Sequence, residues 1–409
     1  MDAALITKIS LSEVNTLIVA LIALQIGILV LKHVGFLRRL DIPAAVIGAV
    51  VVSLVIYALR SKGDIEIEFG SKLRDLLLLV FFATIGLSAK LSALKAGGRP
   101  LLILCGVTLV LLVLQNLGGI LVAWAHGVPA FYGILVGSAS FVGGPGTALA
   151  WAKEGQALGL RNVMEVAVAA STLAVVVGAL VSGPITGWLV RRHGLKGEHA
   201  GSDMPPWAPP EQAASAPAKS GTTMDSIMFA ILLITCVAAL GDWLNGKAAQ
   251  FGMPLPGFLT AMLAGILITN AADVLRIKTH FEPVERGGDI ALQMFLSISL
   301  MSVKLWVVAQ ILQPLLIAVV LQVVLATAIA VFLLFRWLGR DYDAAVTVGG
   351  FLGFGLSSMP VALATMEQVA QRYGPAPKAF MLITLAGSFF VDFANAFVIK
   401  GFLALPFMR

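Results

Sequence analysis

The sequence is divided into twelve apolar runs, six on each side of a proline-rich break. Runs of about 18 or more apolar residues are long enough to cross the hydrocarbon core of a bilayer as helices. Only 12% of the residues are charged and the mean hydropathy is +0.95, whereas about 25% of the residues of a soluble domain carry charge. The chain is therefore expected to be an all-α polytopic membrane protein. The runs cover residues 14–31, 42–59, 76–91, 101–124, 131–150 and 163–190, and then 227–244, 255–275, 290–306, 314–335, 344–366 and 379–405.

The break between the two sets of runs has a different composition. Residues 192–223 contain five prolines among alanine, serine, glycine and lysine. A segment of this kind cannot build a packed core and behaves as a flexible linker. The sequence thus predicts an N-terminal transmembrane repeat over 1–191, a linker over 192–223 and a C-terminal transmembrane repeat over 224–409.

The two halves are related in sequence. The stretch that begins at Asp75 aligns without gaps with the stretch that begins at Asp289, and the same register matches Pro100 with Pro314. We interpret this similarity as an internal duplication. Looser echoes on either side pair Phe141 with Phe351, Gly143 with Gly353 and Gly159 with Gly374.

The distribution of Lys and Arg indicates how the repeats cross the membrane, because loops rich in these residues stay cytoplasmic. Suppose that the fifth run of each half dips into the membrane and returns, which leaves about five spans per half. With both termini periplasmic and the linker cytoplasmic, most of the 28 Lys and Arg residues then fall in cytoplasmic loops. An odd number of spans makes the halves inverted-topology repeats, whereas six spans per half would make them parallel. The net charge of +6 reflects this orientation and predicts no nucleic-acid partner.

Two glycine-broken segments, Phe141–Trp151 and Phe351–Pro360, interrupt the fifth runs. Irregular backbone at membrane depth is tolerated where it is buried in protein or lines a wet cavity. The N–H groups of a half-helix that restarts after such a break suit a carboxylate, and freed carbonyls suit Na⁺. The alternative is a pair of glycine kinks in ordinary packed spans. The candidate substrate-binding residues are Gly143, Gly144, Gly146, Thr147, Gly353, Gly355, Ser357 and Ser358.

Asp392 lies well inside the last run, where a carboxylate is costly unless it meets an ion, a partner or water. Asn395 follows three residues later, on nearly the same helical face, and could supply a second oxygen. We therefore predict that Asp392 and Asn395 bind sodium. A structural salt bridge or a helix cap is the alternative for Asp392.

Five weaker candidates have ready structural explanations. Glu165 follows Asn162 in a capping-box pattern and lies four residues after Arg161, so it is expected to cap or to form an ion pair. Ser and Thr in a helix often bond their own backbone, and an uncharged polar pair in a span often bonds a neighbouring helix. The five candidates are Glu165, Ser171, Thr172, Gln115 and Asn116.

Other chemistry is not expected. The stretch Gly241–Ala248 resembles a phosphate loop but has Ala248 where the magnesium-binding hydroxyl belongs. The five histidines show no metal-ligand spacing, and no nucleophile and base come together. The sequence predicts neither an enzyme nor a cofactor, and no metal other than Na⁺.

Seven stretches spread over nearly the whole chain form a specific combination. They are FFATIGLSA from Phe81, LKAGGR from Leu94, GGPGT from Gly143, RNVMEVA from Arg161, VSGPI from Val181, the segment from DAAV at Asp343 to GFGL, and the tail FFVDFANAFVIK. Taken together, these stretches resemble the bacterial sodium/glutamate symporter family. That family would have His where this chain has Pro145.

The resemblance implies two inverted halves, each with a glycine-rich re-entrant hairpin, and Na⁺-driven uptake of L-glutamate at the bacterial inner membrane by a homodimer. The resemblance also implies which residues form the binding site. These are Gly143, Gly144, Gly146, Thr147, Gly353, Gly355, Asp392 and Asn395. Two alternatives stay open. One is a Na⁺-coupled carrier of another organic anion, such as a hydroxycarboxylate, and the other is a passive anion channel with a paired-loop filter.

Overall fold

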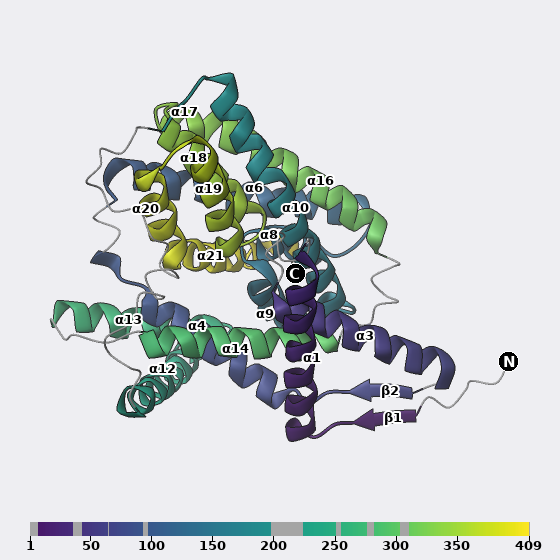
Figure 1. The fold of residues 1–409 in the computed structure, drawn as a ribbon. Coiled ribbons are helices and arrows are strands. Elements are labelled where there is room, and N and C mark those ends of the chain that lie inside the picture. The colour runs from purple at the N-terminus through teal and green to yellow at the C-terminus, as the bar shows by residue number, and fades with distance from the viewer. Residues whose placement is uncertain are drawn as a thin grey trace.

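The computed structural model describes residues 7–35, 43–63, 65–92, 97–197, 224–250, 255–275, 282–302 and 311–408 (Figure 1). Within these ranges the chain is helical apart from two short strands, which confirms the all-helical expectation for the apolar runs. Each of the twelve runs contains helix. Most of the expected linker, from residue 198 to 223, lies outside the described residues.

In the first half, the helices are α1 (Glu13–His33), α3 (Ala44–Gly63), α4 (Lys72–Ser88), α6 (Gly98–Ala125), α7 (Ala130–Leu135), α8 (Ser138–Phe141), α9 (Gly144–Ala157) and α10 (Val163–Arg192). In the second half they are α12 (Met224–Gln250), α13 (Gly257–Val274), α14 (Glu282–Met301), α16 (Leu312–Ala328), η1 (Ile329–Leu334), α17 (Phe335–Trp337), α18 (Tyr342–Leu356), α19 (Met359–Tyr373), α20 (Pro377–Leu385), η2 (Ala386–Phe390), α21 (Val391–Leu403) and η3 (Pro406–Met408). Both η1 and η2 are π-helical turns within longer helices, whereas η3 is a short 3₁₀ helix.

Among the described residues, six helical segments are long and apolar enough to cross a membrane. The fifth run of each half is instead broken into short helices, α7, α8 and α9 in the first half and α18 and α19 in the second. The six long segments are Glu13–His33, Gly98–Ala125, Val163–Arg192, Met224–Gln250, Gly257–Val274 and Leu312–Trp337.

Local sequence signals explain several helix ends. Ser12 precedes α1 and its hydroxyl accepts a hydrogen bond from the N–H of Asn15 (3.2 Å), and Asp341 does the same for Ala344 at the start of α18 (2.7 Å). Such side chains satisfy N–H groups that have no partner within the helix. At the other end of α10, Gly194 adopts a positive φ of 59°, which ends the helix.

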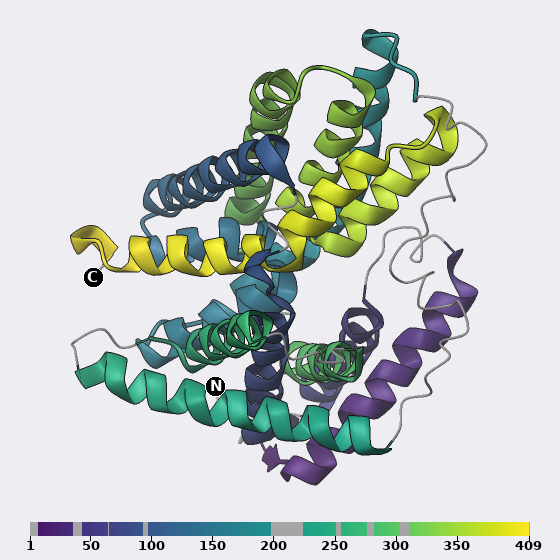
Figure 2. The ribbon, with the colours of Figure 1, turned by 90° about the vertical axis from the view of Figure 1, so that its left-hand side faces the viewer.

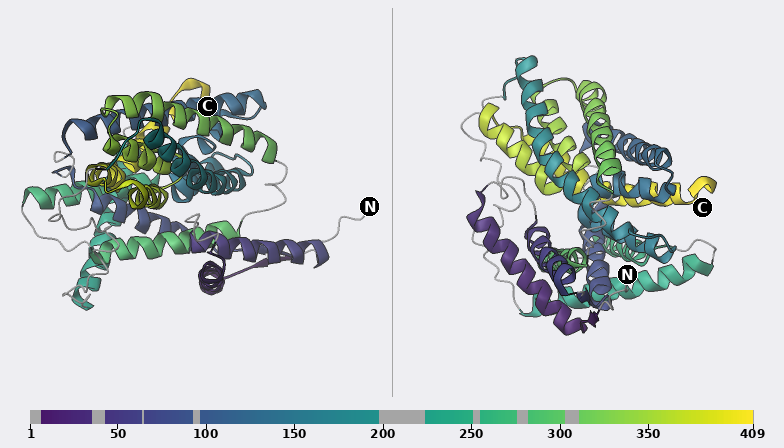
Figure 3. Two further views of the ribbon diagram at one scale, coloured as in Figure 1. Left: turned by 45° about the horizontal axis from the view of Figure 1, so that its top comes forward. Right: turned by 90° about the vertical axis from the view of Figure 1, so that its right-hand side faces the viewer.

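The helices pack in two layers, and each layer draws on both halves of the chain (Figure 1). Layer 1 contains the first three helices of each half, α1, α3 and α4 with α12, α13 and α14. Layer 2 contains α6 to α10 together with α16 to α21. Figures 2 and 3 show the same division from other sides. The two halves of the chain are therefore interleaved, and neither half packs as a body of its own.

Small residues allow the helices of layer 1 to cross closely. Gly86 of α4 faces the backbone of Met262 on α13, and Gly265 of α13 in turn faces Ala83 on α4, where an added Cβ would lie 2.8 Å from the carbonyl oxygen. Close backbone contact of this kind drives packing between membrane helices, because lipid offers no hydrophobic gain between them.

The sequence analysis did not predict the two strands. Strand β1 (Thr7–Ser10) pairs in parallel with β2 (Ile65–Glu68), with Thr7 opposite Ile65. The pair connects the chain before α1 to the chain after α3. None of its residues lines the cavity described below.

Candidate transport site

A cavity of about 460 Å³ lies between the two layers. Its walls come from both halves of the chain and from both broken runs. Layer 1 contributes Pro43, Phe81, Asp289, Leu292, Gln293 and Leu296. Layer 2 contributes Val142, Gly143, Gly144, Pro145, Gly146, Thr147, Val175, Phe354, Ser358, Met359, Pro360, Gly387, Val391 and Asp392.

The first break contributes every site residue that the sequence predicted there. Helix α8 ends at Phe141 and α9 starts at Gly144, whose φ of +63° is one that glycine adopts without strain. Gly143, Gly144, Gly146 and Thr147 all line the cavity. The first turn of α9 is therefore exposed to the cavity, with N–H groups that have no partner in the helix.

Pro145 has a structural role that the sequence analysis did not foresee. It is the second residue of α9, and Pro360 is the second residue of α19. Proline is favoured in the first turn of a helix because its missing N–H would have no intrahelical partner there. Both helices thus start in the same way at the wall of the cavity.

The second break lies within the predicted segment Phe351–Pro360, but after its glycines. Helix α18 continues to Leu356, so Gly353 and Gly355 lie inside it and do not line the cavity. Gly353 instead permits close packing of α18 on Ala362 of α19. The break falls at Ser357 and Ser358, of which Ser358 lines the cavity and Ser357 is fully buried beside it.

The two breaks meet. A Cβ added to Gly144 would lie 3.3 Å from the backbone carbonyl oxygen of Ser357. Gly178 of α10 packs on the other side of the second break, where an added Cβ would lie 2.6 Å from the Cβ of Ser357. The first break and the second break therefore pack directly against each other, at Gly144 and Ser357.

Asp392 lies in the first turn of α21, directly after the π-helical turn η2. Its side chain lines the cavity and, among the described residues, forms neither a hydrogen bond nor an ion pair. Single π-helical turns inside α-helices often occur at functional sites. A partly buried carboxylate within a membrane-spanning segment that has no protein partner is expected to meet a cation or water.

Asn395 does not share this cavity, although the helical spacing placed it near Asp392. It is fully buried and bonds to Ser138 at the start of α8. Its Oδ1 accepts a hydrogen bond from the Ser138 hydroxyl (2.6 Å) and its Nδ2 donates to the Ser138 carbonyl (3.1 Å). Asn116 holds the same residue, since its Oδ1 accepts from the Ser138 N–H (3.1 Å) and hydroxyl (3.0 Å).

Two glutamines hold the broken runs of the opposite halves. Gln115 on α6 donates its side-chain amide to the carbonyl of Gly355 in the second half (2.8 Å). Gln322 on α16 donates to the carbonyl of Val136 in the first half (3.2 Å) and also to the carbonyl of Gln115 (2.8 Å). The expectation that Gln115 and Asn116 serve hydrogen bonding is confirmed, and their partners are the broken segments themselves.

The remaining candidates lie away from the cavity. Glu165 lines a separate cavity of about 320 Å³ together with Arg74 and Arg161. Within the described residues Glu165 forms no ion pair with Arg161, and Asn162 makes no side-chain cap because its backbone is left-handed (φ 57°), so both expected interactions are wrong. Ser171 donates to the carbonyl of Val168 on its own helix (3.2 Å), and Thr172 does not line the central cavity.

Two polar residues on the layer 1 wall were not predicted as site residues. Asp289 and Gln293 are one turn apart on α14, and both line the cavity. The Oε1 atom of Gln293 is buried without a hydrogen-bond partner among the described residues. The sequence analysis had matched Asp289 with Asp75 in the repeat, but that match did not predict that Asp289 lines a cavity.

Asp75 itself joins the two layers. It forms ion pairs with its neighbour Arg74 (3.2 Å) and with Lys153 of α9 (2.9 Å). The Lys153 contact therefore ties a helix of layer 1 to the helix that starts at the first break.

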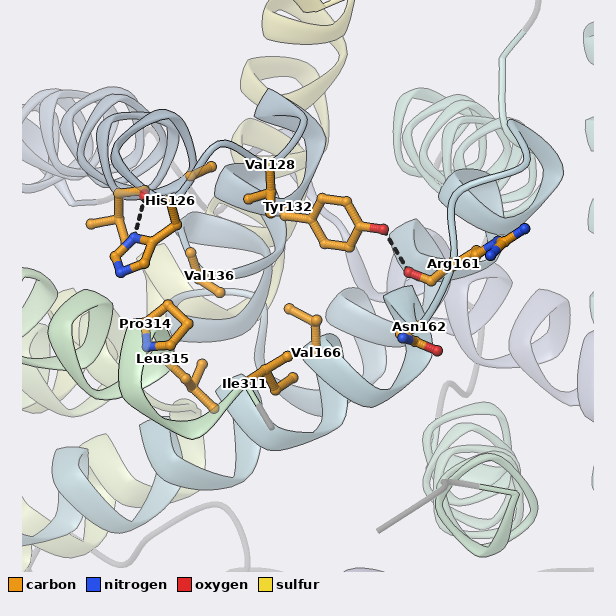
Figure 4. Close-up of a pocket in the computed structure, with 12 residues that line it drawn as sticks. His126, Val128, Tyr132, Val136, Arg161, Asn162, Val166, Ile311, Pro314 and Leu315 are labelled. Atoms are coloured by element: carbon orange, nitrogen blue, oxygen red, sulfur yellow. Dashed lines mark hydrogen bonds between the residues drawn. The ribbon is translucent and has the colours of Figure 1, made fainter. Parts of the chain in front are cut away.

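A smaller cavity of about 250 Å³ lies between the C-terminal end of α6 and the starts of α7, α10 and α16 (Figure 4). Its walls are mostly apolar. At its mouth the Tyr132 hydroxyl donates to the carbonyl of Arg161. None of the predicted site residues lines it, so the central cavity is the better candidate for a transport site.

Comparison with known proteins gives one consistent family. The family model described as sodium/glutamate symporter matches residues 9–375. A sodium/glutamate symporter of Escherichia coli K12 is 35% identical over 403 residues, which cover 97% of this chain and 98% of that protein. A sodium/glutamate symporter of Haemophilus influenzae is 32% identical over 392 residues, which cover 95% and 96% of the two chains. The solved structure of a sodium proton antiporter from Methanocaldococcus jannaschii covers 96% of both chains at 14% identity, but its TM-score of 0.41 is too low to establish a shared fold. The chain belongs to the sodium/glutamate symporter family.

Proposed function

We propose that this protein is a secondary transporter that couples inward movement of Na⁺ to uptake of L-glutamate. The observation that carries the proposal is the central cavity, in which both helix starts and the Asp392 carboxylate share one space between two layers. The names of the relatives support the choice of ion and substrate.

The walls of the central cavity offer a complementary group to each charged group of glutamate. The starts of α9 and α19 offer backbone N–H groups and the positive end of a helix dipole to the two carboxylates. The hydroxyls of Thr147 and Ser358 add hydrogen-bond donors. Asp289 and Gln293 on the opposite wall suit the ammonium group.

Asp392 is proposed as the Na⁺ ligand. Oxygen atoms are the ligands that hard cations prefer, and a carboxylate also supplies compensating charge. Asn395 supports the site one turn further on by fixing Ser138 and with it the start of α8. Because ion and substrate share one cavity, each is expected to raise the affinity for the other by the same factor.

Alternating access would follow from movement of layer 2 against layer 1. The two halves would form inverted-topology repeats whose broken runs are re-entrant hairpins that enter from opposite faces. Corresponding contacts support this: Gly27 and Gly48 bring α1 and α3 together, and Gly241 and Ala261 bring α12 and α13 together. We further propose a homodimer in the bacterial inner membrane, with periplasmic termini and a cytoplasmic linker.

Uptake of radiolabelled glutamate into proteoliposomes tests the function. We expect accumulation that requires an inward Na⁺ gradient, and uptake that proceeds equally without it would contradict symport. Competition by unlabelled hydroxycarboxylates separates glutamate from another organic anion. Accumulation against a glutamate gradient excludes a passive channel.

A further inference from the structure

Another cavity, of about 420 Å³, lies where α10 and the α16–η1–α17 helix both end. Three arginines line it, and no Asp or Glu does. It is separate from the central cavity, and no lining residue is shared between them. The polar and aromatic lining residues are Trp188, Arg192, His193, Phe332, Phe335, Arg336 and Arg340.

The three arginines have no acidic partner. Within the described part of the chain, the side chains of Arg192, Arg336 and Arg340 form neither ion pairs nor hydrogen bonds. The guanidinium of Arg192 lies 5.3 Å from the centre of the Trp188 ring, which positions it without satisfying its N–H groups. Three like charges around one cavity repel each other, so an anion between them would be stabilised.

Helix capping does not account for these arginines. At the end of α10, the N–H of Leu195 already bonds the carbonyl of Val190 (3.0 Å). At the end of α17, the N–H of Arg340 bonds the carbonyl of Phe335 (3.1 Å), and the N–H of Leu338 bonds that of Leu334 (3.0 Å). The terminal carbonyls of Val190, Leu334 and Phe335 therefore have backbone partners and need no basic side chain as a cap.

The wall beside the arginines is apolar and exposed. Phe332 is 75% exposed and Trp188 is 44% exposed, and the neighbouring Trp337 is 55% exposed. Exposed tryptophans next to arginines at the ends of apolar helices are typical of the interface between membrane and water. The cavity thus combines a cationic end with a surface that suits hydrocarbon.

We propose that this cavity binds the phosphate headgroup of an anionic phospholipid, with an acyl chain against Phe332 and Trp188. Guanidinium groups bind phosphate oxygens through two parallel N–H donors, which a lysine cannot offer. Basic pockets between membrane helices on the cytoplasmic side are known to hold acidic lipid headgroups. The site belongs to layer 2 and is independent of the transport reaction proposed above.

Native mass spectrometry of the delipidated full-length protein tests the proposal. We expect phosphatidylglycerol to bind and phosphatidylcholine with the same acyl chains not to bind at this site. Arg336→Gln and Arg340→Gln should each weaken phosphatidylglycerol binding by about fivefold, and the double variant by about 25-fold. Lys196→Gln is the matched control, because Lys196 is exposed at the same end of α10 but does not line the cavity.

Two results with the wild-type protein and the double variant would overturn the proposal, and a third result would come from the control variant. One is wild-type affinity for phosphatidylglycerol in the double variant while its melting temperature in phosphatidylcholine is unchanged. The other is inorganic phosphate that displaces phosphatidylglycerol when both are present at the same concentration, because a soluble anion would then be the ligand. Loss of binding in the Lys196→Gln control to the same extent would also contradict a specific site.

Discussion

Gln115 donates its side-chain amide to the backbone carbonyl of Gly355 over 2.8 Å, although the two residues belong to opposite halves of the chain. Gln322 forms the reciprocal contact with Val136. Both glutamines are fully buried, so water cannot replace these bonds without opening the structure. Each broken run is thus held in place by the fourth run of the other half.

Gln115→Leu should destabilise the protein by about 1–3 kcal/mol, because it leaves the Gly355 carbonyl buried without a partner. Glutamate uptake should fall with it, since the second break would lose its support. Thermal unfolding in detergent and proteoliposome uptake measure the two effects. Leu114→Ala, at the neighbouring position that is 36% exposed, is the control and should change little. Equal stability of Gln115→Leu and wild type would show that this bond contributes nothing.

Asp392→Asn should abolish or strongly weaken the dependence of uptake on Na⁺ while the protein still folds. The substitution keeps the shape of the side chain and removes the charge that is proposed to bind the cation. The measurement is a Na⁺ titration of glutamate uptake. A titration curve identical to that of the wild type would remove Asp392 from the site.

Asn395→Ala should lower the stability of the protein and leave the Na⁺ dependence of uptake unchanged. Its side chain bonds Ser138 and lies outside the central cavity, so the variant should lose stability while any remaining uptake keeps its Na⁺ dependence. A shifted Na⁺ titration at normal stability would instead make Asn395 a direct ligand.

Gly144→Ala should reduce uptake more than it reduces stability. Its φ of +63° costs an alanine about 1–2 kcal/mol, and the added Cβ would lie 3.3 Å from the Ser357 carbonyl, where the two breaks meet. Gly106→Ala on α6 is the control, because an added Cβ there meets no atom within 4 Å. Comparable uptake in the two variants would argue against a functional junction at Gly144.

The ion pair between Asp75 and Lys153 should influence movement between the layers. Asp75→Asn and Lys153→Gln should each alter the uptake rate, because the pair must separate if α9 moves past α4. The charge-swapped double variant, Asp75→Lys with Lys153→Asp, should recover part of the wild-type rate, which is the signature of a direct interaction. If the effects of Asp75→Asn and Lys153→Gln simply add when the two substitutions are combined, the pair does not act as a unit.

The sequence predicted the helices well because apolar runs of membrane length leave the backbone few alternatives. It also located the first break, where Gly143 to Thr147 combine glycine, proline and a hydroxyl within a few residues. The second break also falls inside the predicted segment Phe351–Pro360, but the sequence did not show which of its residues form the break. Gly353 and Gly355 serve packing and hydrogen bonding inside α18, whereas serines form the break.

Other features could not be read from the sequence because they depend on which helices come together. The spacing of Asp392 and Asn395 places them on nearly one face, yet Asn395 reaches Ser138 on a distant segment. Asp289 was visible as a repeat match but not as a wall of the cavity. The interleaving of the halves cannot be predicted from the sequence of either half alone.

That interleaving constrains how the protein is made. When the first half has been synthesised, α1, α3 and α4 have no α13 or α14 to pack against, and the segments from α6 to α10 have no α16 or α18. Gln115 also lacks its acceptor at this stage, since Gly355 is not yet translated. The second half must therefore be synthesised before either layer can close, and until then the first half has only its own helix contacts, such as those of α1 with α3 and of α9 with α10.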